Sequence, residues 1–278
     1  MNYTVENNIL RFNDEFNNPI DDIIFPDELI KLTFGWCFNQ NIDGVKFPNN
    51  LHAINFGYSF NQNIDNVKFP NNLYRINFGF RFDQNIDNVK FPDKLHKLNF
   101  GSYFNQNIDN VKFPNNLREL WFDQLFNQNI DNVKFPPKLR VLIFSIYFDQ
   151  KLDNVILPPK LRVIGFGYDY KYNINNIISK LNIKAIQIAS DELIFDDINF
   201  PNSLEYLRIF SNSNSSNIAQ MNAPNLHTID LQHVGVDGLS HMQLPLHIKK
   251  VICNEENKDL IKVPYGCELK VHTSSYTL

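Results

Sequence analysis

The chain has 278 residues, a formal net charge of −4 and three cysteines. This balance lacks the basic excess typical of nucleic-acid-binding proteins, and three scattered cysteines are too few for a disulfide framework. The opening residues MNYTVENNILRFNDEF show no secretory signal, and no run of about 18 apolar residues could span a bilayer. We therefore expect an intracellular protein with no nucleic-acid partner and no membrane association.

One phrase recurs along most of the chain, for example as FNQNIDNVKFPNNLYRINFG from Phe60 to Gly79. Its central leucine recurs at a constant interval, at Leu29, Leu51, Leu73, Leu95, Leu117, Leu139 and Leu161. A fixed period of this size predicts a repeat solenoid, here as one domain over residues 1–278. In chain order we expect an N-terminal cap over 1–15, regular repeats over 16–169, degenerate repeats in the same frame over 170–253, and a C-terminal cap over 254–278.

Each repeat is numbered here from its first phenylalanine, so that Phe60 is position 1 and Arg81 is position 22. Positions 16 to 20 alternate between outward and inward residues, which predicts a short strand with one buried face. Position 11 is proline in the well-formed copies, and only about 15 residues join successive strands, so a helix does not fit between them. The phenylalanines at positions 1 and 10 are expected to form two parallel buried stacks.

Three polar positions predict turn geometry. Position 7 carries Gly, Asn or Asp, which favours a backbone with positive φ, and the side chain at position 2 is expected to accept a backbone N–H in an Asx-type turn. Position 6 is an aspartate row, for which turn capping and a calcium ladder are both conceivable. A lysine follows three residues later in most copies and would compete with a cation, so we predict turn capping and no metal. The row contains Asp43, Asp65, Asp87, Asp109, Asp131 and Asp153.

Signatures of chemistry are missing from the sequence. It has no CxxC or HxxxH spacing, no P-loop, no Rossmann glycine pattern and no G-x-S-x-G motif. We therefore predict that the protein is not an enzyme and needs no cofactor.

The repeats differ most at the outward positions 16, 18 and 20. Polar residues in the first copies give way to apolar ones in mid-chain, where an outward Trp121 lies beside Ile and Val. Such a patch is typical of an interaction hot spot, although apolar residues that cover one another or pack in a dimer would give the same pattern. The predicted partner-binding residues are Trp121, Val141, Ile143, Val163, Asn55, Asn77, Asn99 and Tyr206.

The motif FNNPI at 16–20, the later FNQNI copies and the following FPNNLxxLxFG together resemble the FNIP repeat of amoebozoan and giant-virus proteins. That repeat is similar to the leucine-rich repeat. The predicted fold is accordingly a right-handed, leucine-rich-repeat-like arc with about twelve short parallel strands on its concave face and turn and extended segments on its convex side.

The resemblance implies a protein-interaction scaffold that binds a partner on its concave face, such as a viral or amoebal adaptor for a host protein in the host cytoplasm. Family members often carry an F-box, which links them to ubiquitin ligases. The repeat frame leaves no segment for an F-box here, so a ligase would act in trans. The alternative is a structural or self-assembling protein, and both a monomer and a homodimer remain open.

Overall fold

The computed structural model describes residues 3–189, 197–210, 218, 221–235, 239 and 242–272. The chain forms two compact units: unit 1 comprises Met1–Ser145 with Asn154–Pro158, and unit 2 comprises Ile146–Asp153 with Pro159–Leu278. Within the described ranges, no helix is both long and apolar enough to cross a membrane. The prediction of a single domain over 1–278 stays a prediction.

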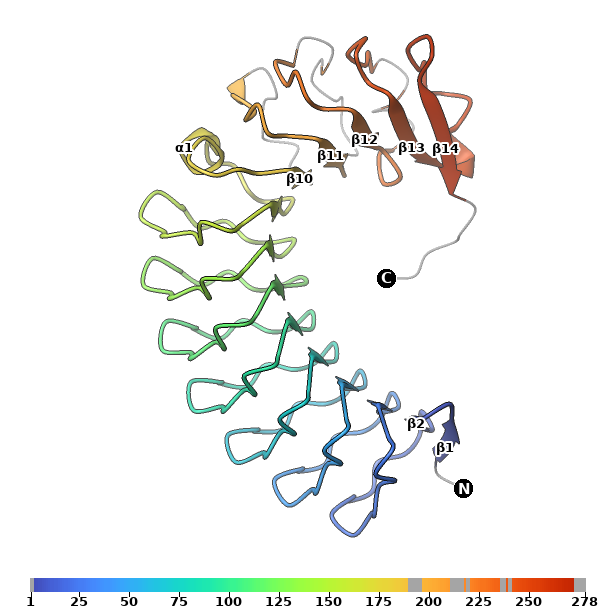
Figure 1. Ribbon diagram of the computed structural model, residues 1–278, viewed down its shortest axis with the longest axis vertical. Coiled ribbons are helices and arrows are strands. Elements are labelled where there is room, and N and C mark those ends of the chain that lie inside the picture. The colour runs from blue at the N-terminus through green and yellow to red at the C-terminus, as the bar shows by residue number, and fades with distance from the viewer. Residues whose placement is uncertain are drawn as a thin grey trace. The chain divides into compact units, whose positions relative to one another are not determined.

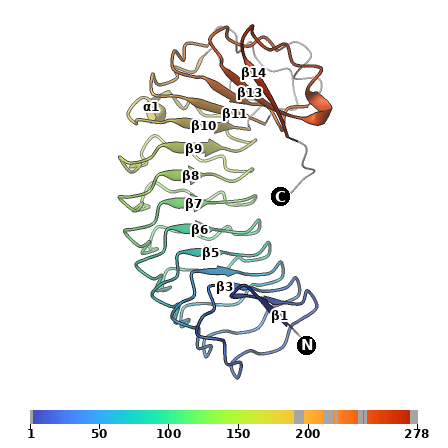
Figure 2. The same cartoon turned by 45° about the vertical axis from the view of Figure 1, so that its right-hand side comes forward.

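Unit 1 is a coil in which each turn contributes one short strand. The strands lie side by side on one side of the coil, and the turn segments lie on the other (Figures 1 and 2). Register partners are one full repeat apart, as in Ile54 opposite Ile76. The strands are β1 (Tyr3–Glu6), β2 (Ile9–Phe12), β3 (Lys31–Thr33), β4 (Ala53–Asn55), β5 (Arg75–Asn77), β6 (Lys97–Asn99), β7 (Glu119–Trp121) and β8 (Val141–Ile143).

Unit 2 continues the same kind of coil with less regular spacing. Ala185 pairs with Tyr206, one residue short of a full repeat, and Lys250 pairs with Glu268, four residues short. Its elements are β9 (Val163–Phe166), α1 (Asn175–Ile178), β10 (Ala185–Ile188), β11 (Tyr206–Ile209), β12 (Thr228–Asp230), β13 (Lys250–Asn254), the 3-10 turn η3 (Glu255–Asn257) and β14 (Glu268–His272).

The predicted repeat solenoid of parallel strands is confirmed. In the described residues, every strand from β2 to β14 takes part in a parallel pair, close to the number expected. Strand residues alternate in burial, as in β4, where Ile54 is buried between two half-buried neighbours. Most of the described connections are turns and extended segments, and α1 and η3 are short helical turns among them. Sequence periodicity predicted the strands because the buried face of each strand needs an apolar residue at every second position.

The N-terminal cap is a β-hairpin. β1 pairs with β2 in antiparallel fashion, and the loop residues Asn7 and Asn8 have φ of 51° and 61°. Two consecutive residues with positive φ match the two-residue hairpin turn, and asparagine tolerates this conformation. The hairpin covers the edge of β2 that lies opposite to β3.

The phenylalanines at position 1 form a continuous buried column. Phe60, Phe82, Phe104 and Phe126 follow one another with ring centroids 6.1 Å apart at each step and nearly parallel planes. Each ring also stacks on the phenylalanine at position 19 of the preceding strand, 4.0 Å away for Phe100 and Phe104. This prediction is confirmed.

The row at position 10 is looser. Phe69 and Phe91 stack at 6.5 Å, and Phe113 is 9% exposed. Phe135 is only half-buried, so the second predicted stack lies at the border of the core.

A ladder of side-chain amides joins successive repeats, and it corrects the expected Asx-type turn at position 2. The Asn39 Oδ1 accepts the backbone N–H of Asn61 at 2.9 Å, so the bond runs to the next repeat rather than within one turn. Gln62 Nε2 donates to the same oxygen at 2.9 Å. Asn61 repeats the arrangement toward Asp83, as does Asp83 toward Asn105. Because only the oxygen is used, aspartate can replace asparagine at this position.

The turn at positions 4 to 8 also differs from expectation. Asn63 Oδ1 accepts the backbone N–H of Asp65 at 3.0 Å, so the Asx-type turn belongs to position 4. The residues at position 7 do not have positive φ, which among the described residues other than glycine occurs only at Asn7 and Asn8. The turn closes instead through a 3.2 Å bond from Val67 N–H to the Ile64 carbonyl oxygen, which the ordinary helical region allows.

The first five aspartates of the row are half-buried and accept side-chain amide bonds in place of the expected turn-capping bonds, whereas Asp153 is exposed. Asp65 Oδ2 accepts from Asn63 Nδ2 at 3.3 Å and from Asn88 Nδ2, one repeat on, at 3.5 Å. These aspartates therefore link neighbouring turns through amide groups.

Glycine at position 20 follows from the tightness of the coil. A Cβ placed on Gly79 would lie 1.7 Å from the carbonyl oxygen of Gly57, and one on Gly57 would lie 1.7 Å from that of Gly35. Only glycine permits this backbone approach. The close column ends where position 20 becomes Asp123 and then Ser145.

Candidate functional site

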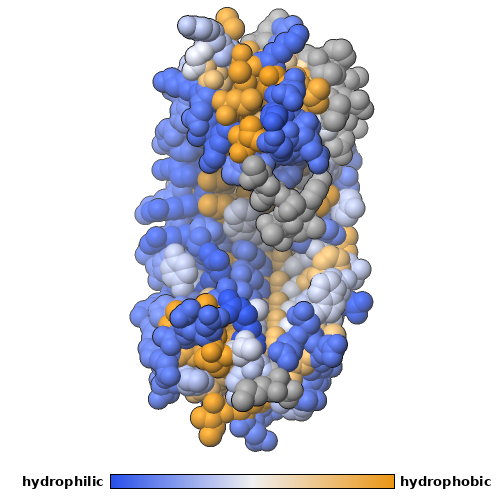
Figure 3. Space-filling model, turned by 90° about the vertical axis from the view of Figure 1, so that its right-hand side faces the viewer, coloured by the Kyte–Doolittle hydropathy of each residue, from blue (hydrophilic) through white to orange (hydrophobic). Residues whose placement is uncertain are grey.

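The strand face, meaning the outward positions 16 and 18 of the parallel strands, is the surface on which the repeats differ most. The register places Asn55, Asn77 and Asn99, at position 18 of β4, β5 and β6, opposite one another, and Asn99 opposite Trp121. Inward positions 17 and 19 are buried throughout, so these side chains point the other way. Figure 3 looks toward this side and shows long hydrophilic stretches with separate hydrophobic patches.

The apolar part of the face in unit 1 is centred on Trp121. Trp121 is 37% exposed, Val141 is half-buried, and Ile143 lies opposite Trp121 in the register. Ile143 is only 5% exposed. The expectation that Ile143 presents an open apolar surface is therefore wrong, and Trp121 supplies most of the accessible apolar area of this pair.

The three predicted asparagines form a half-buried row next to Trp121. Asn77 Nδ2 donates to Asn55 Oδ1 at 2.7 Å. The Oδ1 atoms of Asn77 and Asn99 are buried and have no partner within the described chain. The row thus keeps acceptor oxygens at its Trp121 end and an amide donor at Asn55.

The two predicted residues in unit 2 lie on position 16 of their strands. Val163 is half-buried in β9. Tyr206 is half-buried in β11, and its hydroxyl donates to Asp230 Oδ2 at 2.5 Å. Burial and the bond to Asp230 raise the pKa of Tyr206 well above its ordinary value.

Sequence reasoning missed the ionic group around Asp230. Asp230 is 1% exposed although it occupies an outward position, and Arg208 binds its Oδ2 through Nη2 at 2.7 Å and Nε at 2.8 Å. Asp230 Oδ1 accepts the Gln232 backbone N–H at 3.1 Å. A buried carboxylate of this kind needs several donors, and here the neighbouring strand and its own loop provide them. Alternation alone marked Asp230 as an outward residue and could not reveal its burial.

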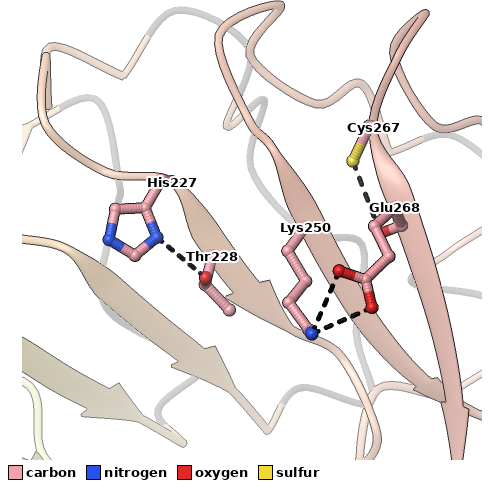
Figure 4. Close-up of polar contacts among 5 residues, drawn as sticks. All are labelled: His227, Thr228, Lys250, Cys267 and Glu268. Atoms are coloured by element: carbon pink, nitrogen blue, oxygen red, sulfur yellow. Dashed lines mark hydrogen bonds and ion pairs between the residues drawn. The ribbon is translucent and has the colours of Figure 1, made fainter.

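Charges at position 16 pair across neighbouring strands in both units. In unit 1, Lys97 Nζ lies 2.6 Å from Glu119 Oε1. In unit 2, Lys250 Nζ lies 3.0 and 3.1 Å from the two carboxylate oxygens of Glu268 (Figure 4). The other two contacts of that view join His227 Nδ1 to Thr228 Oγ1 at 2.9 Å and Cys267 Sγ to the Glu268 carbonyl oxygen at 3.7 Å.

The model of the family named FNIP Repeat matches four overlapping segments, 38–81, 82–125, 104–147 and 126–169. Residues 38–169 are FNIP repeats. The resemblance inferred from FNQNI and FPNNL is thereby confirmed over this range. A repeat solenoid of this architecture is a scaffold for protein interaction or structure, and such families are generally non-enzymatic.

Comparison with curated proteins returned no match. Among solved structures, "The crystal structure of CroV588 a novel circular LRR protein structure" is 20% identical with a TM-score of 0.40, covering 98% of this chain and 60% of that one. "The Crystal structure of Pneumococcal vaccine antigen PcpA" is 12% identical with a TM-score of 0.20, covering 98% of this chain and 91% of that one. The chain thus spans 60% of the length of the first structure.

An aromatic row with one exposed end, at Trp36, follows the glycine column, and sequence reasoning did not identify it. Trp36 stacks on Tyr58 at 4.2 Å, and Tyr58 stacks on Phe80 at 4.6 Å. These residues occupy position 21, directly after the glycine column. The signal was present in the sequence as aromatic residues one repeat apart, but the row lies in a turn and not in the alternating strand. The rings of this row stack face to face.

No group of three or more His, Cys, Asp or Glu side chains within the described ranges could hold a metal ion.

Proposed function

We propose that this protein is a non-enzymatic scaffold that binds a partner protein on its concave strand face, with Trp121 as the central anchor. The observation that carries this proposal is the exposure of Trp121 at 37% on the strand face, next to the half-buried asparagine row. Tryptophan is strongly enriched among residues that dominate binding energy. In unit 1, Val141 is proposed as a supporting contact and the buried Ile143 as the packing neighbour of Trp121, whereas Val163 and Tyr206 are proposed as contacts on the strand face of unit 2.

The test uses the two tryptophans of the chain, Trp36 and Trp121. A partner recovered from amoebal lysate is purified, and its affinity is measured for the intact protein, Trp121→Ala and Trp36→Ala. Trp121→Ala should weaken binding by about 2 kcal/mol or more, the usual range for a hot spot. Trp36 is the more exposed at 57% but lies off the strand face, so Trp36→Ala should bind almost normally. Equal losses in both variants would contradict a strand-face site.

A finer form of the proposal is an adaptor that presents a host protein to a ubiquitin ligase in trans, in the host cytoplasm. It rests on the resemblance to FNIP-repeat proteins alone. Ubiquitination of the purified partner by added ligase components, with and without this protein, would test it.

A structural or self-assembling role is the second candidate, and one observation favours it. β1 pairs only with β2 in the described residues, and its side chains Tyr3 and Val5, which lie opposite the buried Phe12 and Leu10, are themselves 36% and 50% exposed. An edge strand with open backbone groups is a template for another chain. Light scattering over a concentration series separates the candidates, because assembly through β1 should raise the mass and Val5→Lys should reverse it.

A further inference from the structure

A cavity of about 290 Å³ opens on the strand face of unit 1. It exists because position 16 reads Lys31, Ala53 and Arg75 on three adjacent strands. The methyl group of Ala53 leaves a gap between two long cationic side chains, whose backbones are about 10 Å apart at the usual strand spacing. The residues lining the cavity are Lys31, His52, Ala53, Asn55, Tyr74 and Arg75.

The two cations that flank the gap have no anionic partner. Within the described chain, neither Lys31 nor Arg75 makes an ion pair, whereas Lys97 at the same position is paired with Glu119. No acidic side chain lines the cavity. Two unpaired cations facing one small space favour an anion between them.

The remaining lining adds one hydrogen-bond donor and one aromatic wall. Asn55 uses its Oδ1 to accept from Asn77, which leaves its amide group as a donor. His52 Nδ1 lies 2.6 Å from the Asn50 carbonyl oxygen and so donates to it, which makes Nε2 of the neutral ring an acceptor, so the added donor is the Asn55 amide. Tyr74 stacks on His96 at 4.5 Å and supplies the aromatic wall of the cavity.

We propose that this cavity binds a phosphorylated tyrosine side chain of the partner protein, which rests on the proposed scaffold function. A phosphoryl group carries a charge of about −1.5 to −2 and three acceptor oxygens, and this matches two cations with an additional donor better than a carboxylate does. The phenyl ring of the ligand would pack on Ala53 and Tyr74, which both line the cavity.

The test is a titration of the intact protein with phenyl phosphate, followed through the backbone amide signals of Ala53 and Asn55. We expect saturable binding that Lys31→Ala and Arg75→Ala each weaken by about tenfold, the loss of one charge-assisted contact. Ala53→Leu should remove binding without any change of charge, because it fills the gap. Lys97→Ala is the matched control and should bind as the wild type does. Thermal melting of each variant confirms that it is folded.

Three results would overturn the proposal. The first is no saturable shift with phenyl phosphate, and the second is equal affinity for phenylacetate, which would make the cavity a simple carboxylate site. The third is equal affinity for inorganic phosphate or phosphoserine, which would exclude recognition of the ring. Trp121→Ala should bind phenyl phosphate normally. If Trp121→Ala loses partner binding but the wild type does not bind phenyl phosphate, the cavity proposal alone is overturned. If the wild type binds phenyl phosphate but Trp121→Ala keeps partner binding, the Trp121 interface alone is overturned.

Discussion

The two units use different means to join one turn of the coil to the next. In unit 1, the same atoms meet at every step: Asn39 accepts from Asn61, and Asn61 accepts from Asp83, each at 2.9 Å. In unit 2, the connections are individual, as in the bonds from Tyr206 and Arg208 to Asp230. The sequence must therefore repeat strictly where identical side chains bond to one another. It can vary where each bond joins a different pair of residues.

This difference also separates the roles of the positions. A change at an inward or ladder position of unit 1 affects two neighbouring repeats, because each residue is both donor and acceptor or packs on both sides. Outward positions are constrained only where a particular pair bonds, as in Asn55 with Asn77, and the cavity at Ala53 and the exposed Trp121 occur at outward positions without such a pair. Solenoid stability depends on such nearest-neighbour contacts, so the two classes of position should respond differently to substitution.

The largest effect is expected from the phenylalanine column. Phe104→Ala removes a ring that stacks on Phe82, Phe126 and Phe100, and it should destabilise unit 1 by about 3–5 kcal/mol. Chemical denaturation measures this loss. The half-buried Phe135→Ala is the control and should cost clearly less, and equal losses would show that column position does not matter.

Removal of the Asp230 carboxylate should be the most damaging polar change in unit 2. Asp230→Ala leaves Arg208 and the Tyr206 hydroxyl without their acceptor. We expect the free energy of unfolding to fall by about 2–3 kcal/mol. This is below the full range for buried pairs because the Arg208 side chain is 34% exposed. Chemical denaturation compares the loss of stability in Asp230→Ala with the loss in Lys97→Ala. A loss below that of Lys97→Ala would mean that the Asp230 group contributes no stability.

The amide ladder predicts an intermediate effect and an exception. Asn61→Ala removes the acceptor for the Asp83 N–H and for Gln84 Nε2, which should cost about 1–2 kcal/mol. Asn61→Asp should be nearly neutral, because Asp83 serves as acceptor in the next repeat. Thermal melting of the two variants decides whether the oxygen is the functional atom. If Asn61→Asp lost as much as Asn61→Ala, the amide nitrogen would be essential instead.

Tyr170 offers a stabilising change where unit 2 departs from the repeat. It occupies position 1, stacks on Phe148 at 6.3 Å and is fully buried, but its hydroxyl has no partner in the described residues. Tyr170→Phe should raise stability by about 1 kcal/mol. Burial raises the pKa of Tyr170, so the folded state holds this proton more tightly, and stability should fall above pH ~10. That fall should be smaller in Tyr170→Phe, as measured by denaturation at pH 8 and about pH 11.

The smallest effect is expected from metal removal. Because Asp65 Oδ2 accepts two amide bonds, the aspartate row should need no cation, and a chelator should leave the melting temperature unchanged. A fall of several degrees would instead indicate a metal that binds only the folded state.

Much of the fold could be predicted because its signals lie along the chain. The constant repeat period placed Ile54 and Ile76 opposite each other, and alternation assigned the inward side chains of each strand. The candidate site was harder. The outward positions of Trp121 and Asn99 were predictable, but the burial of Ile143 and Asp230 depends on what neighbouring strands place over them.

The sequence by itself determined the period, the strand positions, the buried phenylalanine column and the absence of helices from the regular repeats, because these depend on residue type and spacing. Only the tertiary structure decided which atoms of successive repeats meet. The Asn39 oxygen could have accepted a local N–H, but the coil brings the N–H of Asn61 to 2.9 Å. Gly57 is needed because the backbone of the preceding repeat, at Gly35, approaches it, and the cavity at Ala53 exists because two long side chains flank a short one. Such contacts depend on the rise of the coil, which no single repeat encodes.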